Sequence, residues 1–278
     1  MIEHSFLHLP GIGPAKEQKL WNAGITRWDE LRIVACEVVS AAKRAEFEAA
    51  LDLSCEAWDE RNFSYFAQNL PKSDMWRMIP GREQNIAYVD IETTGLHRPP
   101  EGYSTTITFL FRGEVLQEYE YAKKRQLIEY ILSESEIVCT FNGASFDIPW
   151  MQREFNCVFT QPHVDLRVWM CKQGFKGGLK SIQKLMTDIP QRTGMDITGY
   201  DAVKLWKMHL DGVNGALETL LTYNAEDTLV LHPLLVKAFN KEVETHPQFQ
   251  LNPLKMPILP KLKTDICPNV YSLLGYSE

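Results

Sequence analysis

The sequence has no hydrophobic run long enough to cross a membrane as a helix. Such a helix needs about 20 consecutive apolar residues, and no stretch of the 278 residues approaches that length. The first residues, Met1 to His4, also lack the basic-then-apolar order of a signal peptide. We therefore expect a soluble, cytoplasmic protein with no membrane partner.

Paired cysteines are missing as well. The six cysteines are scattered along the chain, and no two of them form a Cys-x-x-Cys pair. This spacing argues against a zinc knuckle and against a framework of disulfides. We expect reduced thiols, most of them buried.

Positively charged residues are fewer than negatively charged ones. The chain has 29 Lys and Arg residues and 36 Asp and Glu residues, which gives a formal net charge of -7. Phosphate contacts dominate nucleic-acid binding and favour Lys and Arg, so this balance argues against a nucleic-acid partner. The objection is weak, because bound cations neutralise clustered acids and local basic surface guides the substrate. The spacing of Lys172, Lys176, Lys180 and Lys184 predicts such a surface, although a solvated charged face is an equal interpretation.

Length and composition predict one main domain with a smaller one attached. With 45% hydrophobic and 23% charged residues, the chain has enough apolar material for a substantial core. Residues 1–78 have helical patterns and should form a small N-terminal helical domain. The polar stretch 71–81, which contains two prolines and a glycine, is the expected linker. The main domain should span residues 79–240, and residues 241–278 should form a proline-rich extension packed on it.

The main domain begins with patterns typical of strands. Residues 86–91, 105–111, 115–121 and 137–141 are apolar, β-branched or aromatic runs, and residues 123–132 have helical spacing. Mainly helical patterns follow. This order predicts an α/β fold with a mixed sheet flanked by helices.

Four carboxylates and a tyrosine lie in these elements. Asp90 and Glu92 are two residues apart in a strand and should project from the same face. Asp147 should lie near the start of a helix, and Tyr223 and Asp227, four residues apart, should share one face of another. Carboxylate oxygens are the ligands that Mg²⁺ or Mn²⁺ prefers, and two such ions can clamp both the attacking and the leaving oxygen of a phosphodiester.

The segments around these residues resemble the three motifs of the DEDD superfamily of 3′→5′ exonucleases, which has a ribonuclease H-like fold. Asp90-Ile-Glu92-Thr-Thr-Gly-Leu96 is similar to the first motif and Asn142-x-x-x-Phe-Asp147 to the second, and Asp227 falls in the third. A tyrosine four residues before the last Asp marks the tyrosine type (DEDDy). The histidine type would need His where Thr222 stands.

The resemblance implies a role for each acid. Asp90 and Asp227 would bind the more tightly held ions, with Glu92 and Asp147 as further ligands, directly or through water. Tyr223 would orient the nucleophilic water, because a phenol with a pKa of about 10 is a poor base at neutral pH. Glu226 adjoins Asp227 and is an alternative ligand, although the offset from Tyr223 favours Asp227.

Further residues are implied to contact the substrate. Thr93 and Leu96 would lie against the terminal nucleotide, Asn142 near the sugar and Phe146 near the base. The stretch that contains Gly178-Leu-Lys180 resembles a small prokaryotic ribonuclease H-like group of predicted exonucleases, and we count Lys180 among the substrate-binding residues.

The N-terminal segment Leu9-Pro-Gly-Ile-Gly13, followed by Lys16, resembles a helix-hairpin-helix element. Gly11 and Gly13 would let backbone N–H groups approach a phosphate without regard to base identity, with Lys16 beside them. A plain packing corner between helices is the alternative interpretation.

The leading hypothesis is a metal-dependent 3′→5′ exonuclease with two Mg²⁺ or Mn²⁺ ions, acting on DNA or RNA that is single-stranded or has a 3′ end. A ribonuclease H-like endonuclease and a non-catalytic nucleic-acid-binding protein with the same fold are the alternatives. Since none of the four acids is missing, the sequence favours an enzyme.

Overall fold

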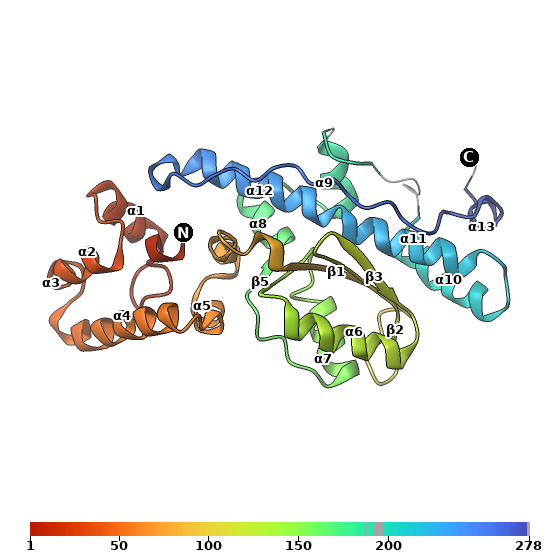
Figure 1. The fold of residues 1–278 in the computed structure, drawn as a ribbon, viewed down its shortest axis with the longest axis horizontal. Coiled ribbons are helices and arrows are strands. Elements are labelled where there is room, and N and C mark those ends of the chain that lie inside the picture. Colours follow the sequence, from red (N-terminus) through yellow and green to blue (C-terminus); the bar gives the residue numbers. More distant parts are fainter. Residues whose placement is uncertain (187, 192–196, 277–278) are drawn as a thin grey trace.

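A five-stranded mixed sheet forms the centre of the molecule (Figure 1). The computed structural model describes residues 1–186, 188–191 and 197–276. The strand order is β3-β2-β1-β4-β5, with β1 antiparallel to β2, β2 antiparallel to β3, and β4 parallel to both β1 and β5. The strands are β1 (Ile86–Thr93), β2 (Ser104–Phe111), β3 (Glu114–Glu118), β4 (Ile137–Thr140) and β5 (His163–Asp165).

Helices precede, interrupt and follow the strands. In the N-terminal region they are α1 (Pro14–Asn22), α2 (Trp28–Ile33), α3 (Ala35–Val38), α4 (Arg44–Asp59) and α5 (Phe63–Asn69). Those of the main domain and the C-terminal region are α6 (Tyr121–Glu134), α7 (Asp147–Phe155), α8 (Leu166–Lys172), α9 (Leu179–Leu185), α10 (Gly199–Leu210), α11 (Ala216–Leu229), α12 (Leu231–Thr245) and α13 (Pro268–Leu273). The predicted α/β fold with helices flanking a mixed sheet is confirmed. The prediction missed β5, because three residues are too few to show a strand pattern.

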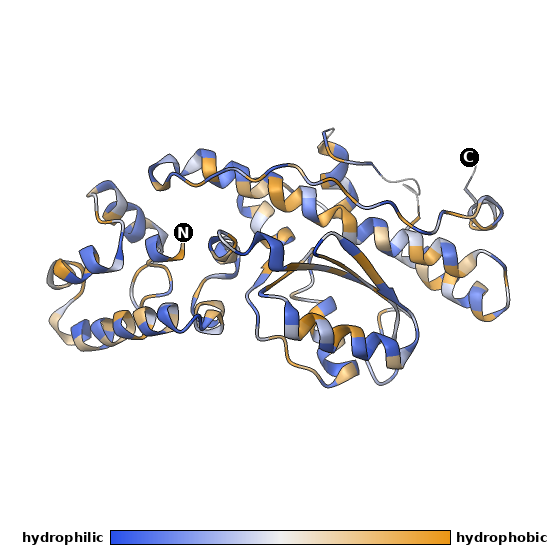
Figure 2. Cartoon of the chain, viewed as in Figure 1, coloured by the Kyte–Doolittle hydropathy of each residue, from blue (hydrophilic) through white to orange (hydrophobic). Residues whose placement is uncertain are grey.

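The sheet lies between two layers of helices (Figure 1). On one face, Val89 and Ile91 of β1 belong to a buried cluster with Ile128 of α6 and Trp150 of α7. The opposite face is covered by α11, which contacts β1 and β2. Strands β1 and β2 are buried along almost their whole length, and Figure 2 shows hydrophobic colours along parts of them. Asp90 and Glu92, which alternate with Val89 and Ile91, therefore face α11.

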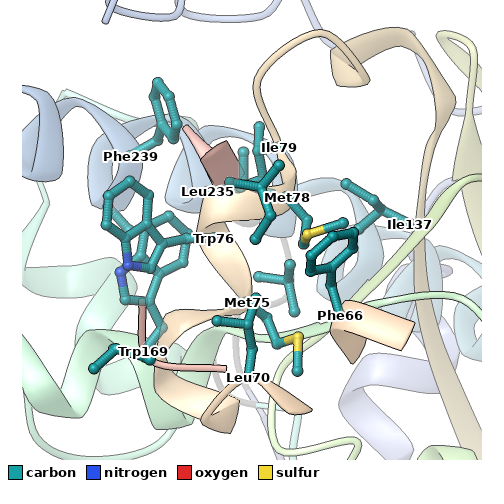
Figure 3. Close-up of a cluster of buried hydrophobic side chains, with 14 of the residues drawn as sticks. Phe66, Leu70, Met75, Trp76, Met78, Ile79, Ile137, Trp169, Leu235 and Phe239 are labelled. Atoms are coloured by element: carbon teal, nitrogen blue, oxygen red, sulfur yellow. The ribbon is translucent and has the colours of Figure 1, made fainter. Parts of the chain in front are cut away.

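The segment expected to be a polar linker is instead a buried 3-10 helix, Lys72–Met78. Trp76 is 1% exposed and stacks on Trp169 of α8 with ring centroids 6.1 Å apart. Figure 3 shows Met75 and Met78 in the same apolar cluster as Phe66 and Ile137. The expectation of a polar linker was wrong because the apolar side chains of this short segment outweigh its prolines and charges. It joins the N-terminal helices to the main domain in one continuous core.

Buried charges reinforce this junction. Arg77 makes two 2.8 Å hydrogen bonds to the carboxylate of Glu17 on α1 and a 3.1 Å bond to Asp74. Lys172 of α8 donates to both oxygens of Asp74 at 2.9 Å. Lys172 is thus committed to this network, and the predicted basic surface loses one of its members.

The C-terminal region follows the long helices α11 and α12 (Figure 1). Helix α12 runs past residue 240 to Thr245, and the chain then has no helix or strand from residue 250 to 267. Leu251, Leu254, Leu259 and Leu262 of this stretch pack against the main core. Helix α13 follows, and its Val270 packs in one cluster with Tyr223.

One other expectation concerns the cysteines. Five cysteines are described as free, but Cys139 alone among them is fully buried, so the expectation of mostly buried thiols was wrong. Trp21 and Trp28 of the N-terminal region are both buried. Within the described residues, no helix is long and apolar enough to span a membrane.

Candidate active site

Three carboxylates meet where β1 passes under α11. Asp90 and Glu92 come from β1 and Asp227 from α11, and each offers an oxygen that lies within 4.8 Å of the other two. The strand spacing places the first two on one face, and the position of Asp227 late in α11 brings the third above them. Glu226 is not part of this group among the described residues, so the geometry favours Asp227 as the ligand of the third segment.

The fourth acid, Asp147, lies beside the same part of β1 but comes from helix α7. Strand β4 pairs with β1 only from Ile86 to Tyr88, so the later backbone of β1 is open on that side. The N–H of Ile91 donates a 3.2 Å hydrogen bond to Oδ1 of Asp147, the first residue of α7. A buried backbone donor left by the end of the parallel pairing thus fixes the fourth acid beside β1.

A second aspartate holds the loop that carries Asp147. The carboxylate of Asp165, at the end of β5, accepts hydrogen bonds from the backbone N–H groups of Asn142 (2.8 Å) and Ala144 (3.1 Å). Asn142 has a φ of 68°, and a side chain at Gly143 would collide with Thr140. The conformation of this turn therefore depends on both its own residues and on Asp165, which sequence reasoning missed.

Asp90 is oriented from α11. The Nδ2 group of Asn224 donates a 2.7 Å hydrogen bond to Oδ2 of Asp90. The amide oxygen of Asn224 accepts from the hydroxyl groups of Thr106 (3.0 Å) and Thr108 (2.6 Å) on β2. Both hydroxyls donate to the oxygen, so the amide has to present its NH₂ to Asp90. Sequence reasoning missed Asn224, although its place between Tyr223 and Asp227 was a signal.

A cleft of about 430 Å³ contains all four acids and Tyr223. Tyr223 is buried, and Nζ of Lys180 lies 4.8 Å from the centroid of its ring. Of the residues predicted to contact substrate, Asn142, Phe146 and Lys180 line the cleft. The N-terminal ends of α9 and α10 also line the cleft, through Gly178, Leu179, Ser181, Thr198 and Gly199.

The other predicted contacts lie elsewhere. Thr93 is buried, and its hydroxyl donates a 2.8 Å hydrogen bond to the carbonyl of Gly95. Leu96 is 87% exposed and is not among the residues that line the cleft. Arg167, outside the predicted set, donates to Oδ1 of Asn142 at 2.8 Å.

The glycine-rich turn of the N-terminal region is separate from the cleft. Gly11 has a φ of 77°, Gly13 precedes the first residue of α1, and Lys16 donates a 3.5 Å hydrogen bond to the carbonyl of Gly11. Before the turn the chain forms only a short 3-10 helix, Ile2–His4. The resemblance to a helix-hairpin-helix element therefore rests on the turn and on α1.

The electrostatics of the cleft favour cations. Burial, followed by the charges of Asp227, Asp147 and Glu92, raises the pKa of Asp90 well above its usual range. Burial also raises the pKa of Asp147 to about 7, against the hydrogen bond from Ile91, with Asp165 and Asp227 adding to the rise. Ionised acids this close together repel one another unless positive charge lies between them. Three converging carboxylates are a suitable donor set for a hard divalent ion.

A comparison with known families agrees with this fold and site. Residues 87–239 match the family model described as the RNase_H superfamily. This span begins in β1, ends in α12 and includes all four acids, and the chain belongs to the ribonuclease H superfamily. Its fold and its acidic cluster are those of a nuclease that acts on nucleic acid and uses divalent metal. No curated protein matches the chain.

Proposed function

We propose that the protein is a metal-dependent 3′→5′ exonuclease of the tyrosine type that hydrolyses phosphodiester bonds of DNA or RNA. The observation that carries the proposal is the convergence of Asp90, Glu92 and Asp227 within 4.8 Å, in a cleft that also contains Asp147 and Tyr223. Two Mg²⁺ or Mn²⁺ ions fit this donor set, with Asp147 serving the second ion directly or through water. When bound, the ions supply an acidic water and stabilise charge on the phosphate.

The protein residues have distinct tasks in this proposal. Asp90 is held in one orientation by Asn224, so its oxygens are arranged for ligation before an ion arrives. The hydroxyl of Tyr223 positions the attacking water. Lys180, whose ammonium group lies against the Tyr223 ring, restricts the tyrosine and places positive charge near the phosphate.

Substrate contacts in the cleft follow from its lining. Asn142 is held by Arg167 and Asp165, and contacts the sugar of the terminal nucleotide, while Phe146 packs near its base. The backbone of Thr93 and the side chain of Leu96 contact the same terminal nucleotide. Leu96, which is 87% exposed, acts in this proposal as an apolar wedge at the entrance. The turn at Gly11 and Gly13, with Lys16, holds the phosphates of a more distant part of the substrate.

A degradation assay tests the function. The full-length protein is incubated with 5′-labelled and 3′-labelled DNA and RNA, single-stranded and duplex, with and without Mn²⁺. A 5′-labelled ladder that shortens stepwise supports a 3′→5′ exonuclease. Internal fragments of fixed size would instead indicate the ribonuclease H-like endonuclease.

An active-site variant accompanies the assay. Asp90→Ala should abolish metal-dependent degradation and leave the fold intact, because Asp90 is a proposed ligand. Asp211→Ala, a change at an exposed aspartate just after α10, is the matched control and should keep full activity. Equal activity of both variants would show that the acidic cluster is not catalytic.

A further inference from the structure

An exposed aromatic side chain lies at the rim of the cleft. Tyr200 is 71% exposed, although tyrosine is usually more buried. It directly follows Gly199, which lines the cleft with Thr198. A nucleic-acid strand that left the cleft past Gly199 would run next to this residue.

A lysine is fixed over the same ring. Nζ of Lys204, one helical turn further along α10, lies 4.8 Å from the centroid of Tyr200. The ammonium group also donates a 2.9 Å hydrogen bond to Oδ1 of Asp201, which restricts its position. The large exposed area of the ring leaves room for a second planar group beside the cation.

The helix that presents this pair is itself held in place. The second oxygen of Asp201 accepts from the hydroxyl of Thr198 at 2.6 Å and from that of Tyr276 near the C-terminus at 2.8 Å. Further along α10, the indole N–H of Trp206 donates to the hydroxyl of Tyr103 at 3.0 Å. These hydrogen bonds hold α10, and with it Tyr200 and Lys204, in place, which lowers the entropic cost of binding a ligand.

We infer that Tyr200 and Lys204 form a stacking platform for an unpaired nucleobase of the substrate strand just outside the cleft. The inference rests on the proposed nuclease function and narrows the substrate to nucleic acid whose bases near the cleaved end are unpaired. Every base offers a π-face to an aromatic ring, so the platform accepts any sequence, and the lysine meets the neighbouring phosphate. A paired base keeps its face stacked within the duplex and is not available to Tyr200.

Binding and cleavage of single strands test the platform. Since stacking on one aromatic residue contributes about 1–3 kcal/mol per base, Tyr200→Ala should raise the KM for a single-stranded oligonucleotide about tenfold and leave kcat unchanged. Tyr200→Phe, which keeps the ring, should behave like the wild type. Leu210→Ala is the control, because Leu210 is 63% exposed at the other end of the same helix.

Abasic substitutions locate the contact. Oligonucleotides that lack one base at a time should show one position where the missing base raises the KM of the wild-type protein but not that of Tyr200→Ala. If no position behaves in this way, or if Tyr200→Ala has the KM of Leu210→Ala, the platform does not exist and the nuclease function is unaffected.

A binding measurement separates the platform from the catalytic proposal. The dissociation constant of a fluorescein-labelled single-stranded oligonucleotide is measured by fluorescence anisotropy for the wild type and Tyr200→Ala. Weaker binding by the variant alone supports the platform even if no cleavage occurs, in which case only the proposed function fails. Equal binding by the two proteins, or no binding by the wild type, overturns the platform.

Discussion

The side-chain amide of Asn224 donates a 2.7 Å hydrogen bond to Asp90, so the helix that carries Tyr223 and Asp227 also orients the first acid of β1. Asn224 is fully buried, and its oxygen is occupied by Thr106 and Thr108. Two segments separated by more than a hundred residues are thereby joined at the site. The orientation of Asp90 depends on a residue that is not itself a metal ligand.

Replacing Asn224 tests this dependence. We expect Asn224→Ala to lower affinity for Mn²⁺ about 10–100-fold, as is usual when a partner of a ligating group is removed. The loss should be visible in a calorimetric titration of the metal-free protein. Thr228→Val is the control, since Thr228 is buried on the same helix and donates only to backbone carbonyls. Unchanged affinity in Asn224→Ala would mean that Asp90 needs no such support.

Asp165 offers a second test, at the turn before α7. Without its carboxylate, the N–H groups of Asn142 and Ala144 lose their acceptor, and the turn that carries Asp147 loses one of its supports. We expect Asp165→Ala to reduce kcat about 100-fold, a typical cost of displacing a catalytic group by about 1 Å. The measurement is the steady-state rate on a labelled oligonucleotide, normalised to folded protein by circular dichroism.

A purely structural role for Asp165 predicts another pattern. The variant would then lose thermal stability but retain its rate per folded molecule and its affinity for Mn²⁺. Asp165→Asn should recover part of the rate, because the amide keeps one acceptor oxygen.

The buried charges at Arg77 concern stability. Arg77→Ala leaves the carboxylate of Glu17 buried without its charged partner and removes one of the two cations that contact Asp74. Breaking a buried ion pair in this way costs about 3–5 kcal/mol. Urea unfolding should show this loss in the free energy of unfolding. Arg32→Ala removes the exposed ion pair with Asp52 and should cost at most about 1 kcal/mol. Similar losses in the two variants would contradict the role given to the Arg77 network.

His8 should make stability depend on pH. Burial, followed by the charge of Arg77, lowers the pKa of His8 from 6.5 to about 3. Between these values the unfolded chain binds a proton that the folded protein does not, so stability falls as pH drops from 6.5 toward 3. One such group contributes a slope of up to about 1.4 kcal/mol per pH unit.

The variant His8→Phe removes that contribution. Its free energy of unfolding, measured in urea at pH 4.5, 5.5 and 6.5, should fall less steeply with decreasing pH than that of the wild type. Phe66→Leu, a change at a ring that packs on His8, should lower stability without altering the slope. Parallel curves for His8→Phe and the wild type would show that His8 is protonated equally in both states.

Local patterns predicted the elements of the site well. The β1 pattern placed Asp90 and Glu92 on one strand face, and Tyr223 and Asp227 were assigned to a single helix, as the structure has them. These relations depend only on the periods of a strand and a helix. The three-residue strand β5 and the burial of Trp76 had no such local signal, because packing against distant parts of the chain decides both.

The sequence by itself determined which acids the protein has and which elements carry them, and the ribonuclease H superfamily model spans all of these acids. The tertiary structure decided how the acids are oriented, through Asn224 on Asp90 and Asp165 on the turn before Asp147. It also decided that the segment around Arg77 is buried, and that Tyr200 is exposed beside the cleft. Contacts between residues far apart in the chain cause these features, and common residue types such as Asn, Asp and Tyr do not reveal such contacts until the chain has folded.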